Sequence, residues 1–121
     1  MANNELGGPV VLNAILDYIK TNFQKTKYSY RFIMQPETIG SIAYLSKFRE
    51  ELKKEILCGI NLSCVGDERS FSYINSPYKN TLADKVLESA TRGLKNLKVY
   101  SFLERGSDER QYCTPNINLP F

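Results

Sequence analysis

Three clusters of polar residues carry side chains that could do chemistry, and each follows an apolar stretch of the chain. They occupy residues 35–38, 65–69 and 105–110. In an α/β fold, binding and catalytic groups gather at or just beyond the carboxyl ends of the strands. Glu37 could therefore be a metal ligand or general base, because the helix dipole keeps a carboxylate at a helix start ionised. The alternative is an ordinary acidic residue of a first helical turn.

The other two clusters are open to the same two kinds of interpretation. Asp67 could be a metal ligand at the end of a strand, or the acidic residue of a Gly-Asp turn. The last cluster offers groups for both anions and cations, and Tyr112 follows it. A loop whose charges pair with one another would account for that cluster equally well.

The sequence contains 0 histidines, although histidine is the commonest general base near neutral pH and the commonest zinc ligand. The chain by itself therefore excludes serine-histidine and cysteine-histidine mechanisms and any zinc site that needs imidazole. Its cysteines, Cys58, Cys64 and Cys113, are odd in number and lack C-x-x-C spacing, which predicts reduced thiols. Cys58 and Cys64 share one face of a predicted strand, so we expect them to be core thiols.

A chain of 121 residues, 42% hydrophobic and 24% charged, has the composition of one globular domain, taken as residues 1–121. The net charge of +3 comes from dispersed charges, so the sequence predicts no nucleic-acid partner. We find no run of 18 apolar residues and no signal-peptide pattern at the start. These features predict no membrane partner and a cytoplasmic location.

Hydrophobic periodicity places helices and strands between the polar clusters. The helices are expected over residues 9–25, 37–54 and 82–93. The strands are expected over residues 28–34, 56–64, 70–75 and 97–103. Thr81 and Asp84 have the spacing of a helix cap. The third helix is expected to bury an apolar stripe formed by Leu82, Val86, Leu87, Ala90 and Leu94.

This order of elements predicts an α/β fold of three layers, in which crossover helices cover both faces of a mixed, mostly parallel sheet. A strand is missing before the first helix, and the irregular tail after Gly106 has no element behind it. We therefore expect a domain that is incomplete at both ends, as a truncated or split reading frame would give.

Four short motifs resemble one known family. They are YRF at residues 30–32, PETIGS at 36–41, CVGD at 64–67 and RGSDERQYC at 105–113. Together they resemble an aminopeptidase-like family often encoded in bacterial polysaccharide-biosynthesis clusters, which is similar to the co-catalytic zinc aminopeptidases. The resemblance covers nearly the whole chain and implies a three-layer, zinc-aminopeptidase-like fold.

The resemblance also implies roles for particular residues. Two metal ions activate a water in the zinc aminopeptidases, and Glu37 lies in the region of their glutamate base or ligand. Asn4 stands where the metal-bridging aspartate is expected, and an amide bridges two cations poorly. Ser63 stands where a strand-end aspartate ligand is expected, which leaves Asp67 as a substitute. The implied substrate-binding residues are Ser107, Asp108, Glu109, Arg110 and Tyr112, with Glu109 in place of a histidine.

From the resemblance we expect full-length relatives to hydrolyse peptide-like or amide substrates with zinc. This chain lacks a complete metal site, so we expect it to hold no zinc and to be inactive alone. Two alternatives remain open. The chain could be a non-catalytic module that binds a peptide or a sugar, or a subunit completed by a separately encoded partner that supplies the missing histidines.

Overall fold

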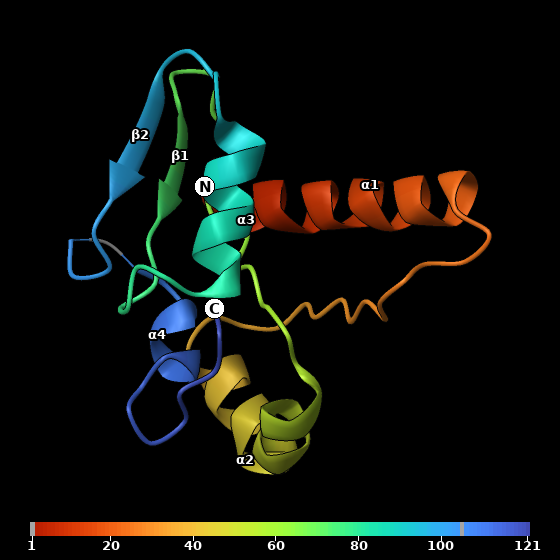
Figure 1. The fold of residues 1–121 in the computed structure, drawn as a ribbon, viewed down its shortest axis with the longest axis vertical. Coiled ribbons are helices and arrows are strands. Elements are labelled where there is room, and N and C mark those ends of the chain that lie inside the picture. The colour runs from red at the N-terminus through yellow and green to blue at the C-terminus, as the bar shows by residue number, and fades with distance from the viewer. Residues whose placement is uncertain (1, 105) are drawn as a thin grey trace. The chain divides into compact units, whose positions relative to one another are not determined.

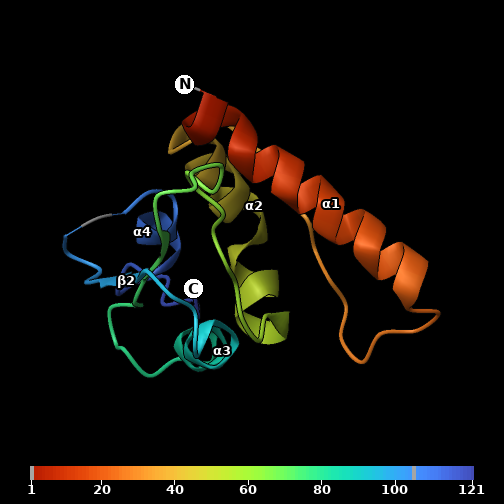
Figure 2. The ribbon, with the colours of Figure 1, turned by 90° about the horizontal axis from the view of Figure 1, so that it is seen from above.

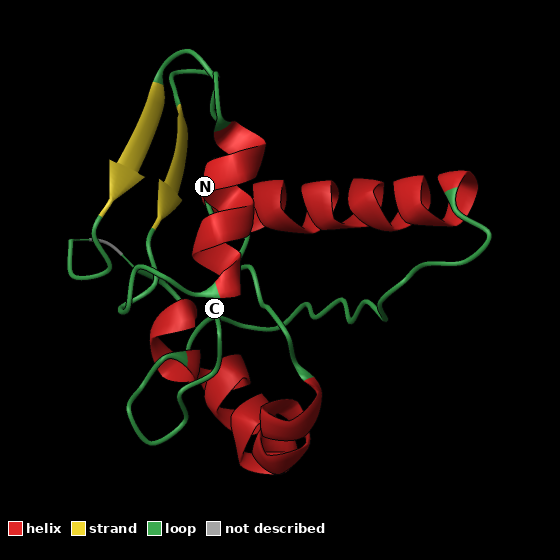
Figure 3. Cartoon of the chain, in the orientation of Figure 1, coloured by secondary structure: helices red, strands yellow, loops and turns green. Residues whose placement is uncertain are grey.

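The computed structural model describes residues 2–104 and 106–121. The helices are a π-helical η1 (Ala2–Leu6), α1 (Gly7–Asn22), α2 (Ile39–Glu55), α3 (Leu82–Thr91) and α4 (Glu109–Tyr112), and the strands are β1 (Phe71–Ile74) and β2 (Leu97–Tyr100) (Figures 1 and 3). The α/β class is confirmed as a set of helices with a small two-stranded parallel sheet. Within the described ranges, no helix is both long and apolar enough to cross a membrane.

The chain divides into two compact units, and the first consists of residues 1–35 and 62–67. The long helix α1 begins beside the 62–67 segment, where a Cβ atom on Gly8 would lie 2.6 Å from the carbonyl oxygen of Leu62. Only glycine allows two backbones to approach so closely. The helix ends at Asn22, whose side-chain amide donates to the Tyr18 carbonyl at 2.8 Å. The predicted first helix is thus confirmed, with both ends shifted toward the N-terminus.

The second unit consists of residues 36–61 and 68–121 and contains a β–α–β segment. Strands β1 and β2 pair in parallel from Phe71 opposite Leu97 to Ile74 opposite Tyr100. The ladder is extended by the Asn75 amide, which donates to the Tyr100 carbonyl at 3.0 Å. Both strands were predicted, and the helix between them provides the crossover that parallel strands require.

Helix α3 begins with the predicted cap. The Thr81 hydroxyl accepts the Asp84 amide at 3.3 Å, and the Asp84 carboxylate accepts the Thr81 amide at 2.9 Å. Asp84 also accepts the Ser76 amide at 2.7 Å and the Ser76 hydroxyl at 2.6 Å, and it is buried. Burial alone would raise the pKa of Asp84, but the hydrogen bonds from Ser76 and Thr81 outweigh it and lower the pKa.

The core of the second unit joins α2 to the C-terminal segment. Helix α4 contacts α2 (Figures 1 and 2). The Tyr112 ring stacks on Phe121, with centroids 4.3 Å apart. A Cβ atom on Gly59 would lie 2.3 Å from the Phe121 ring, while the Gly59 amide donates to Pro120 at 2.9 Å. The buried members of this core are Leu45, Leu52, Tyr112 and Leu119.

Two predicted strands, residues 28–34 and 56–64, are loops instead. A strand needs a neighbouring backbone to satisfy its N–H and C=O groups, and within the described residues β1 and β2 pair only with each other. The side chains that suggested alternation are left exposed, as Tyr30 (57%) and Ile60 (49%) show. Alternation alone therefore predicted these two strands wrongly.

Two burial predictions also need correction. The stripe expected in the core is largely exposed, at 48% for Leu82 and 43% for Val86, whereas Ala83 and Asp84 are buried. A two-stranded sheet offers too little surface to cover a second face of α3. Cys64 was expected in the core but is exposed, because the 56–64 segment is a loop.

The Asp84 network predicts a pH-dependent stability. Asp84→Asn should lower the free energy of unfolding by about 1–3 kcal/mol at pH 7, because the buried donors of Ser76 and the half-buried donors of Thr81 lose their charged acceptor. Since the folded pKa lies below the unfolded value, the wild-type contribution is complete above about pH 4 and is lost as the pH falls through the folded pKa. Urea unfolding between pH 3 and 7 measures this loss, and Asp17→Asn on exposed α1 is the matched control. Equal pH profiles for wild type and Asp84→Asn would contradict the prediction.

The cysteines predict a graded thiol reactivity. Burial raises the pKa of Cys113 to about 11, and its Sγ lies 3.5 Å from the Phe121 carbonyl oxygen. At pH 8, Cys113 should react with a disulfide reagent at least about 100-fold more slowly than an unperturbed exposed thiol. The exposed Cys64 should react first, so Cys64→Ser should remove the fast phase. A Cys113 that reacts quickly without denaturant would show that the 112–121 core is open.

Candidate functional site

The second unit brings two of the predicted polar clusters together. The Ser107 hydroxyl donates to the Glu37 carboxylate in a short hydrogen bond, and the Thr38 amide donates to Asp108 Oδ1 at 2.7 Å. The partners lie 70 residues apart in the chain in both cases. The turn before α2 is thus fastened to the loop before α4, and both candidate residues Glu37 and Asp108 take part.

Both oxygens of Glu109 are occupied within the same loop region. Oε1 accepts the Ser107 amide at 2.6 Å, and Oε2 accepts the side-chain amide of Asn61 at 2.9 Å. Asn61 was not singled out from the sequence, where it fell on the polar face of a predicted strand. The carboxylates of Asp108 and Glu109 therefore accept hydrogen bonds from backbone amides and from the uncharged side chain of Asn61.

The side chains of Arg110 and Tyr112 contact other residues of the chain. The Arg110 guanidinium donates to the Phe102 carbonyl at 3.4 Å and lies over the Phe102 ring, 5.8 Å from its centroid. The Tyr112 side chain is buried in the core against Phe121. A substrate-binding role for these two residues stays a prediction. Arg105, the first residue of this predicted cluster, lies outside the described residues.

The remaining candidates lie in the first unit. Asn4 Oδ1 accepts a hydrogen bond from the Cys64 thiol at 3.2 Å, and Asn3 Oδ1 accepts the Gly66 amide at 2.5 Å. Asp67 is half-buried at the end of the 62–67 segment. Asn3 was missed from the sequence, although asparagine beside a helix start is a common backbone hydrogen-bonding residue. The two asparagines fasten the start of the chain to the 62–67 segment.

The residues present do not fit a pair of zinc ions. Histidine is absent from the sequence, and the described residues contain no group of three or more Cys, Asp or Glu side chains placed to hold one metal ion. A zinc site in proteins uses at least three such ligands, and a co-catalytic pair needs more. We therefore derive no chemical step that passes through zinc in this chain.

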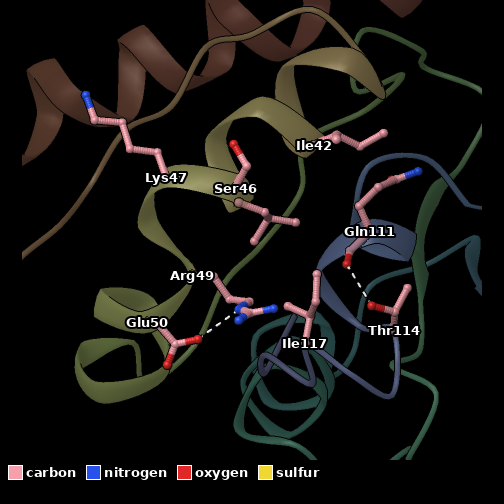
Figure 4. A pocket seen from close by; sticks show the side chains of 9 residues that line it. Ile42, Ser46, Lys47, Arg49, Glu50, Gln111, Thr114 and Ile117 are labelled. Atoms are coloured by element: carbon pink, nitrogen blue, oxygen red, sulfur yellow. Dashed lines mark hydrogen bonds and ion pairs between the residues drawn. The ribbon is translucent and has the colours of Figure 1, made fainter.

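A hollow of about 520 Å³ lies between α2 and the segment that follows Gln111 (Figure 4). Apolar side chains form part of its wall, and the exposed ion pair of Arg49 with Glu50, 2.8 Å long, lies on the α2 side. The Gln111 side-chain oxygen is buried without a hydrogen-bond partner among the described residues. The full lining is Ile42, Leu45, Ser46, Lys47, Arg49, Glu50, Gln111, Thr114 and Ile117. None of the residues predicted from the sequence as site residues lines this hollow.

Known proteins resemble the chain along nearly all of its length. A curated protein of Clostridium acetobutylicum named “Putative polysaccharide biosynthesis protein with aminopeptidase-like domain” is 39% identical over 121 residues, which cover 99% of this chain and 27% of that protein. A crystal structure of a “putative peptidase” from Clostridium acetobutylicum is 38% identical with a TM-score of 0.89, over 98% of this chain and 28% of that one. The chain therefore spans about a quarter of the length of the relatives it matches.

These names confirm the predicted resemblance to aminopeptidase-like proteins of polysaccharide biosynthesis. A family model described as “Domain of unknown function (DUF4910)” matches residues 1–121. The match extends over the two units and over both clusters that meet at Glu37 and Ser107. The chain belongs to the DUF4910 family.

Proposed function

We propose that this chain is a segment of an aminopeptidase-like peptidase domain, and that its 37–38 turn and 107–110 loop border the substrate pocket of that domain. The observation that carries the proposal is the pair of hydrogen bonds from Ser107 to Glu37 and from Thr38 to Asp108. They join two clusters that the family resemblance assigns to the same pocket. A peptide-like or amide substrate is the class that the relatives' names support.

The three-layer α/β/α architecture is part of this proposal. Strands β1 and β2 form a parallel pair, and parallel sheets occur almost only with both faces covered by helices. The exposed Leu82 and Val86 of α3 offer an apolar surface on which further elements could pack. A cytoplasmic location also belongs to the proposal, and three free cysteines support it.

In this proposal the longer relatives bind zinc, and this chain alone does not. Without histidine, and with Asn4 in place of a bridging carboxylate, the 121 residues supply too few ligands. Glu37 remains the candidate general base, because a glutamate can take a proton from a water when it lies within hydrogen-bond reach. In this chain the Glu37 carboxylate accepts a hydrogen bond from the Ser107 hydroxyl.

The isolated chain should not hydrolyse amide bonds. Purified chain mixed with amino-acid p-nitroanilides and zinc should release no p-nitroaniline above the protein-free blank, since the metal pair cannot be completed. Zinc-dependent turnover that disappears in Glu37→Gln would overturn the expectation that the chain alone is inactive. Turnover that is equal in wild type and Glu37→Gln would identify a contaminating peptidase.

A subunit completed by further protein is a second candidate function, and the exposed α3 stripe favours it. Uncovered apolar side chains associate with one another at high concentration. Sedimentation should therefore show a self-association of the wild type that Val86→Glu weakens and Lys85→Glu, one residue earlier on the same helix, leaves unchanged. Equal association of both variants would remove the support for a covering partner on α3.

A further inference from the structure

Thr38 has an unusual backbone conformation for its residue type. Its φ is 62° and its ψ is −67°, and the Ile39 amide donates to the Glu37 carbonyl at 2.7 Å. These values describe a γ-turn of the rare, strained kind, with Thr38 at its centre. Threonine is β-branched, and such residues almost never adopt positive φ unless the surrounding structure holds them there.

The start of α2 does not explain this conformation. Thr38 is the N-cap residue of the helix, a position at which a threonine hydroxyl normally accepts a backbone amide, yet its side chain makes no capping hydrogen bond. The helix side contributes backbone bonds, from Gly40 to Pro36 at 3.0 Å and from Ile42 to Thr38 at 3.0 Å. An ordinary N-cap conformation would keep the bond from Ile42 to Thr38 and would add a side-chain cap.

The contacts that distinguish this turn come from the opposite loop. Asp108 Oδ1 accepts the Thr38 amide at 2.7 Å, and Ser107 donates to the Glu37 carboxylate. These two hydrogen bonds join the consecutive turn residues 37 and 38 to the consecutive loop residues 107 and 108. We infer that Asp108 is a positioning residue, which holds Thr38 in the γ-turn through an oxygen acceptor and thereby orients Glu37 toward Ser107.

The geometry gives this arrangement a consequence for Glu37. A γ-turn reverses the chain within three residues, so a change of φ at Thr38 rotates Glu37 relative to α2. The 107–108 loop thereby fixes the direction of the candidate base. Its value for catalysis rests on the proposed function, whereas the orienting contact itself can be measured in the isolated chain.

Two variants of Asp108 separate an acceptor from a charge. Asp108→Asn keeps a side-chain oxygen, so the Thr38 amide should keep the NMR chemical shift typical of a hydrogen-bonded amide and its protection from hydrogen exchange. Asp108→Ala removes the acceptor, so the Thr38 amide should exchange at least about tenfold faster, as in a locally opened segment. Asp17→Ala on the exposed part of α1 is the control and should change neither quantity.

A glycine at the turn provides an independent test. Glycine adopts positive φ without steric cost, so Thr38→Gly should keep the chain folded and should reduce the loss of stability caused by Asp108→Ala. The T38G/D108A double variant also keeps the test usable if Asp108→Ala alone unfolds. The inference is wrong if Asp108→Asn disturbs Thr38 as strongly as Asp108→Ala does, or if Asp108→Ala leaves the Thr38 amide unchanged.

These readouts do not depend on turnover. An active isolated chain with an intact Thr38 response would overturn the expected inactivity of the chain alone and leave the orienting role standing. If the chain is inactive and the Thr38 amide does not change in Asp108→Ala, the orienting role is wrong and the proposed function is unaffected.

Discussion

The hydrogen bond from the Thr38 amide to the Asp108 carboxylate is the contact on which the arrangement of the candidate site depends. It joins the turn before α2 to the loop before α4, and with the bond from Ser107 to Glu37 it closes a ring of contacts between segments 70 residues apart. A strained turn can persist only where such contacts outweigh its cost.

The hydrophobic core of the second unit holds the loop that makes these two hydrogen bonds. Tyr112 ends α4 and stacks on Phe121, and Gly59 lies close enough to Phe121 that no side chain could take its place. Asn61, two residues later, reaches the Glu109 carboxylate. The loop of polar residues is thus fixed at its end by packing and along its length by hydrogen bonds. Its acidic residues serve first to shape the loop.

Local signals predicted much of the fold, because they act within a few residues. The periodicity of α1, α2 and α3, the two paired strands, and the Thr81 and Asp84 cap all depend on near neighbours. Strands over 28–34 and 56–64 were predicted wrongly, since alternation reports two faces of a segment and not whether a partner strand exists. The contact of Glu37 with Ser107, the strained Thr38 and the contact of Asn61 with Glu109 were not predicted, because they depend on residues far apart in the chain that no local pattern encodes.

The acidic residues of the loop, Asp108 and Glu109, accept hydrogen bonds from other parts of the chain itself. Scalar coupling transmitted through a hydrogen bond, from the Thr38 amide nitrogen to the Asp108 carboxyl carbon, tests this most directly. We expect a resolved coupling in the isolated chain at neutral pH without metal. An absent coupling together with a rapidly exchanging Thr38 amide would contradict it.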